Sequence, residues 1–140
     1  MQELKAFITQ HNILSLAAIL VIILILVVEL LKARRRIYTV TTAETIDMIN
    51  HENAQVIDIR SNEVYRQGHI INAQSIPSRE IRDNPQKLDR FKGKPIIVVC
   101  DAGLESQKIA VLLFKRGHDS YSLAGGIQSW RRAEIPLVKE

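Results

Sequence analysis

The amino-acid sequence predicts an α/β domain with a parallel central sheet and helices on both faces, preceded by one transmembrane helix. Three observations lead to this fold class. Residues 13–28 are apolar except for Ser15, and Leu30 and Leu31 extend the run. Behind this run, short apolar segments typical of strands alternate with amphipathic segments typical of helices. Such alternation favours parallel strands whose connecting helices cover the sheet on both sides.

The apolar run is long enough to cross a bilayer. Residues 13–31 would form about 28 Å of helix, close to the hydrocarbon thickness of a membrane. The alternative is a cleaved signal peptide, which needs a basic start and a cleavage site between small residues. Neither is present, because Glu3 offsets Lys5 and cations follow the run. The expected organisation is a short extracytoplasmic N-terminus (1–12), a transmembrane helix (13–31), a basic juxtamembrane linker (32–37) and the folded domain (38–140).

Four cations follow the apolar run and predict its orientation: Lys32, Arg34, Arg35 and Arg36. Basic residues that flank a span stay in the cytoplasm, so we expect the N-terminus outside and the domain inside, at the cell inner membrane. This basic collar is also expected to contact anionic lipid headgroups.

Charge and cysteine content exclude several classes of function. Residues 1–36 hold five Lys/Arg and two Asp/Glu, whereas residues 37–140 hold 14 and 13, so the basic character is concentrated at the membrane and does not indicate nucleic-acid binding. Cys100 is the only cysteine, which rules out an internal disulfide and fits a reducing compartment. The four histidines are scattered without metal-site spacing, so we expect no metal and no cofactor.

Apolar patterning and capping residues predict the elements of the domain. The expected strands are 37–40, 55–59, 73–76, 95–99 and 121–123. The expected helices are a capping-box helix from Thr41 to about residue 50, then 61–67, 84–93, 106–116 and 127–133.

Cys100 follows the most apolar predicted strand, at the sheet edge where ligands bind in such folds. A short loop from Cys100 onto a helix would aim backbone N–H groups at one point, which favours a thiolate or persulfide on a partly exposed cysteine. The alternative is that Cys100 is a small buried hydrophobic residue at a strand end. Cys100 is the candidate catalytic residue, and the candidate substrate-binding residues are Asp101, Ala102, Gly103, Leu104, Glu105 and Ser106.

Four motifs, in order and at the proper spacing, resemble those of the rhodanese family over residues 38–138. They are the D-x-R strand end at Asp58 and Arg60, the E-x-x-x-x-G-H-I-x-x-A-x-x-I-P segment from Glu63 to Pro77, the active-site loop at Cys100, Gly103 and Ser106, and the L-x-G-G-x-x-x-W ending from Leu123 to Trp130. With the apolar helix added, the chain is similar to small single-span rhodanese proteins. The resemblance implies a parallel sheet and a reaction that moves sulfane sulfur through a cysteine persulfide to a thiophilic acceptor.

The other motif residues are expected to be structural: Asp58 and Arg60 as a pair that orders loops, Gly68 and His69 at a turn, Gly125 and Gly126 as a turn, and Trp130 in the core. The active-site loop departs from the family pattern, because Glu105 stands where active members commonly have arginine and Asp101 adds a second acid. A carboxylate about 6 Å from a thiolate costs about 2–3 kcal/mol at an effective dielectric near 20, and less if the acids face solvent.

Three functions follow from these observations. The first is a sulfurtransferase that carries a persulfide on Cys100, supplied by a donor such as a protein persulfide or an uncharged polysulfide. The second is a catalytically weak or silent module that binds a partner protein at the cytoplasmic membrane face. The third, a phosphatase, needs an arginine to hold phosphate oxygens, and neither position 105 nor position 106 has one.

Overall fold

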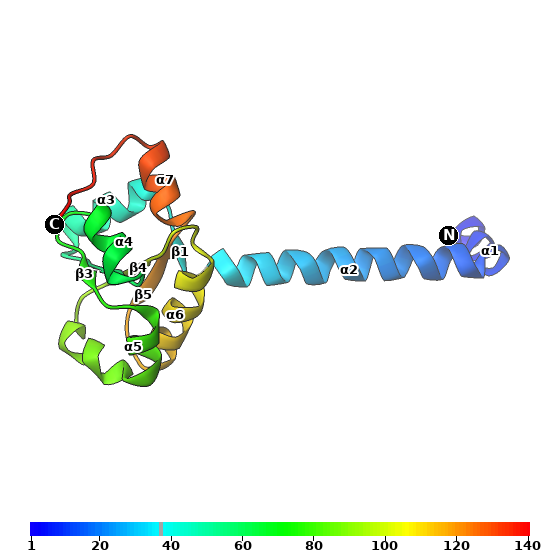
Figure 1. Cartoon of the computed structure of the whole chain (residues 1–140). Coiled ribbons are helices and arrows are strands. Elements are labelled where there is room, and N and C mark those ends of the chain that lie inside the picture. The colour runs from blue at the N-terminus through cyan, green and yellow to red at the C-terminus, as the bar shows by residue number, and fades with distance from the viewer. Residues whose placement is uncertain (37) are drawn as a thin grey trace. The chain divides into compact units, whose positions relative to one another are not determined.

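The computed structural model describes residues 1–36 and 38–140, without the side chains of residues 8 and 34–36. The chain divides into two compact units, Met1–Ile37 and Tyr38–Glu140 (Figure 1). The side chains of Arg34, Arg35 and Arg36, which belong to the expected basic collar, lie outside the described part, as does Ile37 of the first expected strand.

The first unit consists of two helices, α1 (Gln2–Gln10) and α2 (Asn12–Arg36). Within α2, the span Asn12–Ala33 contains an 18-residue window with a mean hydropathy of 3.2 and no buried residues, so among the described residues one helix is long and apolar enough to span a membrane. The segment expected as a linker is helical up to Arg36, because lysine, alanine and arginine are good helix formers and prolong the helix. Helix α1 was not expected from the sequence.

The second unit contains a five-stranded sheet in which every pairing is parallel, as the sequence predicts. Its strands are β1 (Thr39–Val40), β2 (Gln55–Asp58), β3 (Gln74–Ser75), β4 (Ile96–Val99) and β5 (Ser120–Leu123), in the order β1-β5-β4-β2-β3. The central strand β4 is fully buried, and its Val99 lies opposite Asp58 of β2. The carboxyl ends of β2 and β4 therefore lie side by side.

Helices cover both faces of the sheet, and the side chains of β4 alternate between two hydrophobic clusters. Ile96 and Val98 pack in the cluster that includes Ile109, and Ile97 and Val99 pack in the cluster that includes Trp130. The first face is covered by α5 (Ser78–Asp83), the 3-10 helix η1 (Pro85–Phe91) and α6 (Leu104–Lys115). The second face is covered by α3 (Thr42–His51), α4 (Asn62–Gln67) and α7 (Gly126–Arg132).

Within the second unit, the main differences from the sequence prediction concern three helices. Helix α5 was missed, because six residues directly after a proline are too few to show a helical period. The segment expected as an α-helix from Pro85 is a 3-10 helix, a form that suits such a short stretch. Helix α6 begins at Leu104, two residues earlier than expected, so the loop after Cys100 is tighter.

Candidate active site

A tight loop holds the sulfur of Cys100 at the amino end of α6. The backbone N–H groups of Gly103 and Ser106 donate hydrogen bonds to Cys100 Sγ, at 3.1 and 3.4 Å. The thiol lies 3.3 Å from Ser106 Oγ, which in turn is 2.7 Å from Ser122 Oγ on β5. Gly103 adopts a left-handed conformation with φ of 88°, which brings its N–H toward the sulfur. Donors around one sulfur at a helix start stabilise negative charge there.

The expectation of a partly exposed cysteine is wrong, because Cys100 is only 7% exposed. The loop amides and Ser106 surround its sulfur and leave little of it open to solvent. Cys100 nevertheless lines a pocket of about 520 Å³. Access to the sulfur is therefore through this pocket.

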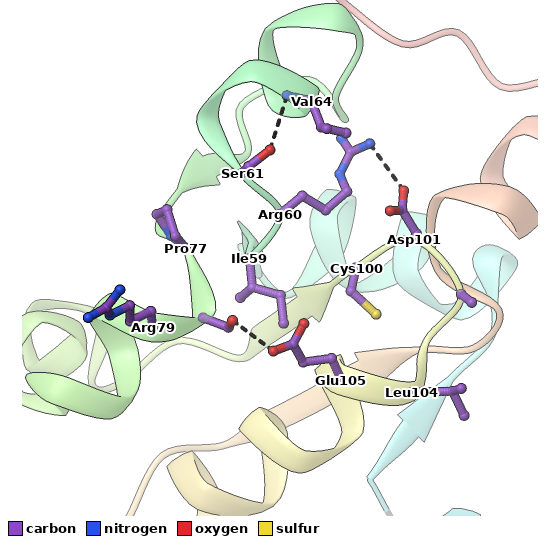
Figure 2. Close-up of a pocket in the computed structure, with 12 residues that line it drawn as sticks. Ile59, Arg60, Ser61, Val64, Pro77, Arg79, Cys100, Asp101, Leu104 and Glu105 are labelled. Carbon is purple, nitrogen blue, oxygen red and sulfur yellow. Dashed lines mark hydrogen bonds and ion pairs between the residues drawn. The ribbon is translucent and has the colours of Figure 1, made fainter.

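The pocket is formed by residues from four parts of the chain, which Figure 2 shows around a common space. They come from the segment after β2, from α4, from the start of α5, and from the stretch that runs from Cys100 into the first residues of α6. Leu104 is an exposed apolar residue of the pocket, at 73%. The lining residues are Ile59, Arg60, Ser61, Val64, Pro77, Ser78, Arg79, Cys100, Asp101, Ala102, Leu104 and Glu105.

The Gly125–Gly126 turn and the start of α7 contact the Cys100 loop and hold it in place. The first N–H groups of α7 donate to the loop carbonyls, Ile127 N to Cys100 O at 2.9 Å and Gln128 N to Asp101 O at 3.2 Å. A Cβ added at Gly126 would collide with the Cys100 carbonyl oxygen. The turn therefore fixes the position of the loop, while Trp130 is buried in the core with 3% exposure.

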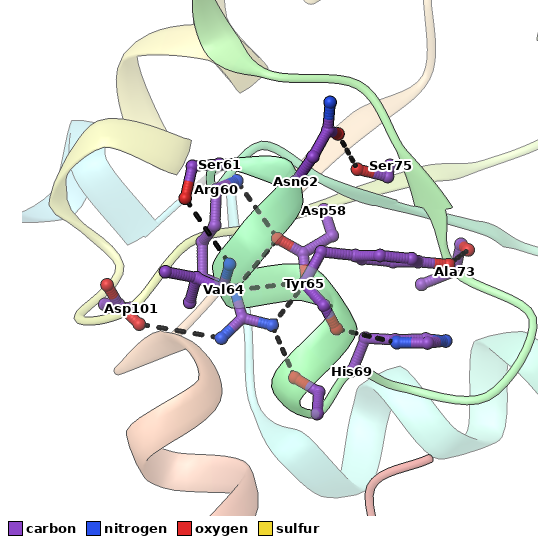
Figure 3. A network of polar contacts seen from close by, with 11 residues as sticks. Asp58, Arg60, Ser61, Asn62, Val64, Tyr65, His69, Ala73, Ser75 and Asp101 are labelled. Atoms are coloured by element: carbon purple, nitrogen blue, oxygen red, sulfur yellow. Dashed lines mark hydrogen bonds and ion pairs between the residues drawn. The ribbon is translucent and has the colours of Figure 1, made fainter. Parts of the chain in front are cut away.

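Asp58 and Arg60 form a buried ion pair beside the pocket (Figure 3). Arg60 Nη2 donates to Asp58 Oδ2 and to the Gly68 carbonyl, both at 2.7 Å, and Nε donates to Asp58 Oδ1 at 3.0 Å. Burial alone would lower the pKa of Arg60, but the hydrogen bonds and charge of Asp58, together with Asp101, raise it above its ordinary value. Arg60 is therefore a fixed cation that ties β2 to the turn at Gly68.

The contacts of His69 are those of a packing residue. Its ring stacks on Tyr65 with centroids 3.8 Å apart, and its Nδ1 lies 2.9 Å from the Tyr65 carbonyl. Its backbone forms an antiparallel bridge with Val138. Figure 3 shows the ring beside Tyr65, and His69 does not line the Cys100 pocket.

Both loop acids are paired with arginines from other elements. Asp101 Oδ1 lies 3.7 Å from Arg60 Nη1. Glu105 Oε1 accepts hydrogen bonds from Ser78 Oγ at 2.8 Å and from Arg82 Nη2 at 3.2 Å. These pairings reduce the electrostatic cost that the sequence indicated for negative charge on Cys100. Ser78 and Arg82 were missed, because no local motif connects them to residue 105.

Comparison with known proteins establishes the family. Residues 41–133 match the family described as the rhodanese-like domain. The chain belongs to this family. Over 141 residues it is 33% identical to the protein YibN of Escherichia coli, with 99% of each chain covered.

Two further relatives place the domain among rhodanese proteins. The thiosulfate sulfurtransferase GlpE of Coxiella burnetii is 30% identical over 89 residues, which cover 63% of this chain and 81% of that protein. The crystal structure of a rhodanese-related protein from Thermoplasma volcanium superposes with a TM-score of 0.66 at 29% identity, covering 73% of this chain and 98% of that one. That solved chain therefore consists almost entirely of the region that matches this rhodanese-like domain.

Proposed function

We propose that the chain is a membrane-anchored sulfurtransferase that carries sulfane sulfur as a persulfide on Cys100. The observation that carries this proposal is the set of donors on Cys100 Sγ, the Gly103 and Ser106 amides, at a residue that lines a pocket. A buried structural cysteine needs neither the donors nor the pocket. The name of the relative GlpE, a thiosulfate sulfurtransferase, supports the same chemistry.

The reaction has two displacement steps at sulfur. The Cys100 thiolate attacks the outer sulfur of a donor R–S–SH, the donor S–S bond breaks, and its electron pair leaves as R–S⁻. Cys100 Sγ then carries the transferred –SH, and the Gly103 and Ser106 amides that donate to Sγ stabilise the Cys100 thiolate before and after the transfer. In the second step an acceptor thiolate or cyanide attacks the outer sulfur and releases the Cys100 thiolate. The loop residues Asp101 to Ser106 surround the reacting sulfurs.

We further propose that α2 anchors the protein in the cell inner membrane with the rhodanese-like domain in the cytoplasm. The stretch Asn12–Ala33 supports a span by length and composition. The cations after the apolar run favour the cytoplasmic side for the C-terminal part of the chain, where a lone thiol stays reduced.

A sulfur-transfer assay on the full-length protein in detergent tests the enzymatic proposal. With a persulfide donor and cyanide as acceptor, wild type should form thiocyanate over many turnovers and Cys100→Ser should form it no faster than the uncatalysed reaction. Circular dichroism should show that the variant remains folded. Equal background rates for the two proteins would contradict the proposal and favour the module that only binds a partner protein.

A further inference from the structure

The Cys100 pocket differs from a simple anion-binding site in its distribution of charge. Arg60 is already engaged by the Asp58 carboxylate and the Gly68 carbonyl, and Asp101 shares the same cation at 3.7 Å. Two carboxylates therefore share one buried guanidinium. Arg60 Nη1 has no hydrogen-bond partner in the described part of the chain, but it is sealed from solvent beside Asp101, so this side of the pocket presents no exposed nitrogen of Arg60 to an anionic substrate.

The opposite side of the pocket presents a carboxylate that is fixed in place. Ser78 and Arg82 both bind Oε1 of Glu105, and within the described part of the chain no hydrogen bond to Oε2 is formed. Glu105 is 45% exposed at its side chain, and Figure 2 shows it facing the same space as Cys100 and Ile59. Its second oxygen is free to accept a hydrogen bond from a ligand.

The two other arginines near the pocket, Arg79 and Arg82, are each paired with a carboxylate and therefore add little attraction for an anionic ligand. Arg79 lines the pocket, but its side chain is 92% exposed and lies 3.9 Å from Asp83. Arg82 is about as exposed as Glu105 and is paired with its Oε1 at 3.2 Å, so this cation is directed at Glu105 and leaves Oε2 as the oxygen without a hydrogen bond in the described part of the chain. The amides of the loop are directed at Cys100 Sγ itself and stabilise its charge.

We infer that Glu105 is a specificity-determining residue that selects organic persulfides carrying a positively charged group near the sulfur, over thiosulfate and other anionic donors. Glu105 Oε2 accepts an N–H bond from the donor while Cys100 Sγ attacks the outer sulfur. The exposed side chain of Leu104 and the apolar residues Ile59 and Val64 contact the carbon chain of the donor. This inference rests on the proposed function, whose reaction it narrows to one class of donor.

The first measurement compares two donors that differ in charge. Cysteamine persulfide and mercaptopropionate persulfide are similar in length, and the first carries an ammonium where the second carries a carboxylate. The rate of single-turnover loading of Cys100, followed by intact mass, is divided for each donor by its rate with a free thiol, because the two leaving thiols differ in pKa. This normalised rate should be at least tenfold higher with the cationic donor in wild type. Glu105→Gln should bring the ratio close to one, while Glu80→Gln, which removes an ion-paired glutamate outside this pocket, should keep the wild-type ratio.

The second measurement tests the charge preference without forming a persulfide, because a methanethiosulfonate reagent transfers its R–S group to the cysteine thiolate, forms a mixed disulfide and releases methanesulfinate. The rates at which Cys100 reacts with cationic (trimethylammonium)ethyl and anionic sulfonatoethyl methanethiosulfonate are each divided by the rate with a free thiol. The cationic reagent should be favoured in wild type and in Glu80→Gln, but not in Glu105→Gln. No preference in wild type, or one that Glu105→Gln leaves unchanged, overturns the inference. A preference for the cationic reagent combined with no persulfide loading from either donor overturns the proposed function and leaves the role of Glu105 in charge selection supported.

Discussion

At the scale of single residues, the position of Cys100 depends on glycines that allow two loops to touch. Gly126 lies against the carbonyl groups of Cys100 and Asp101, and Gly103 lies against the backbone of Gly125. The first turn of α7 then donates hydrogen bonds to the Cys100 loop. The glycines of the two motifs therefore allow the backbones of the Cys100 loop and of the Gly125–Gly126 turn to contact each other, in addition to the motif that supplies the Cys100 thiol.

Gly126→Ala should destabilise the domain more than Gly117→Ala does. Both positions have a positive φ, 58° and 90°, so each alanine costs about 1–2 kcal/mol of backbone strain. Only the alanine at Gly126 also collides with the Cys100 loop, whereas a Cβ at Gly117 meets nothing within 4 Å. Urea unfolding followed by the fluorescence of Trp130, the single tryptophan, measures the difference. Equal losses of stability in the two variants would show that the contact between the two loops contributes little.

Residue-level reasoning predicted the position of Cys100, the Asp58–Arg60 pair and the loop amides, because each follows from a short local motif. The exposure of Cys100 was overestimated, since the closure of the loop depends on α7, which lies far along the chain. The partners of Glu105 could not be predicted, because Ser78 and Arg82 approach it only through the packing of α5 against α6.

At the scale of elements, strands and capped helices were predicted more reliably than the segment between β3 and β4. The capping box at Thr41 and Glu44 forms as expected, and Ser61 caps α4. In contrast, α5 and η1 are short and their positions depend on apolar contacts of Ile81, Leu88 and Phe91 with the sheet. Such tertiary contacts leave no clear period in the sequence.

A buried histidine beside η1 predicts a pH dependence of stability. The side chain of His118 is fully buried, and its Nε2 lies 3.5 Å from Asp89. Burial lowers the pKa of His118 below its ordinary value of 6.5, with Asp89 opposing and the cations Lys92 and Arg116 reinforcing the shift. The unfolded chain therefore binds this proton more readily than the folded chain, so His118 lowers the free energy of unfolding as pH falls through and below about 6.5.

His118→Leu should remove this decrease in the free energy of unfolding at pH values below about 6.5. The wild-type slope attributable to His118 is at most about 1.4 kcal/mol per pH unit, and it should vanish in the variant. Urea unfolding at pH 7 and pH 5 measures both proteins. Parallel profiles would show that His118 is not the group that titrates.

At the scale of the whole molecule, the chain joins an apolar helix to a rhodanese-like domain with its own core. Composition alone predicted this division, because a run of apolar residues of membrane length cannot be enclosed by a domain of this size. The helical state of the first ten residues was not predicted, since their mixture of apolar and polar residues is too short to show a period.

The full-length chain should remain in the membrane pellet after alkaline carbonate extraction, and residues 38–140 should be soluble. The physical reason is the free energy of transferring the apolar side chains of α2 from water into lipid. A reporter fused after Glu140 should be active in the cytoplasm, as the cations after the apolar run predict. Release of the full-length chain by carbonate, or activity of a reporter that works only in the periplasm, would contradict the proposed anchoring.

The most direct test of sulfur transfer is the intact mass of the protein after exposure to a persulfide donor and removal of excess reagent. Because Cys100 is the only cysteine, one added sulfur atom can be assigned to it and checked against Cys100→Ser. We expect wild type to gain the mass of one sulfur and to lose it again when cyanide or a thiol acceptor is added, while Cys100→Ser stays unchanged. A folded wild-type protein that gains no sulfur, or gains it equally in Cys100→Ser, would contradict the account.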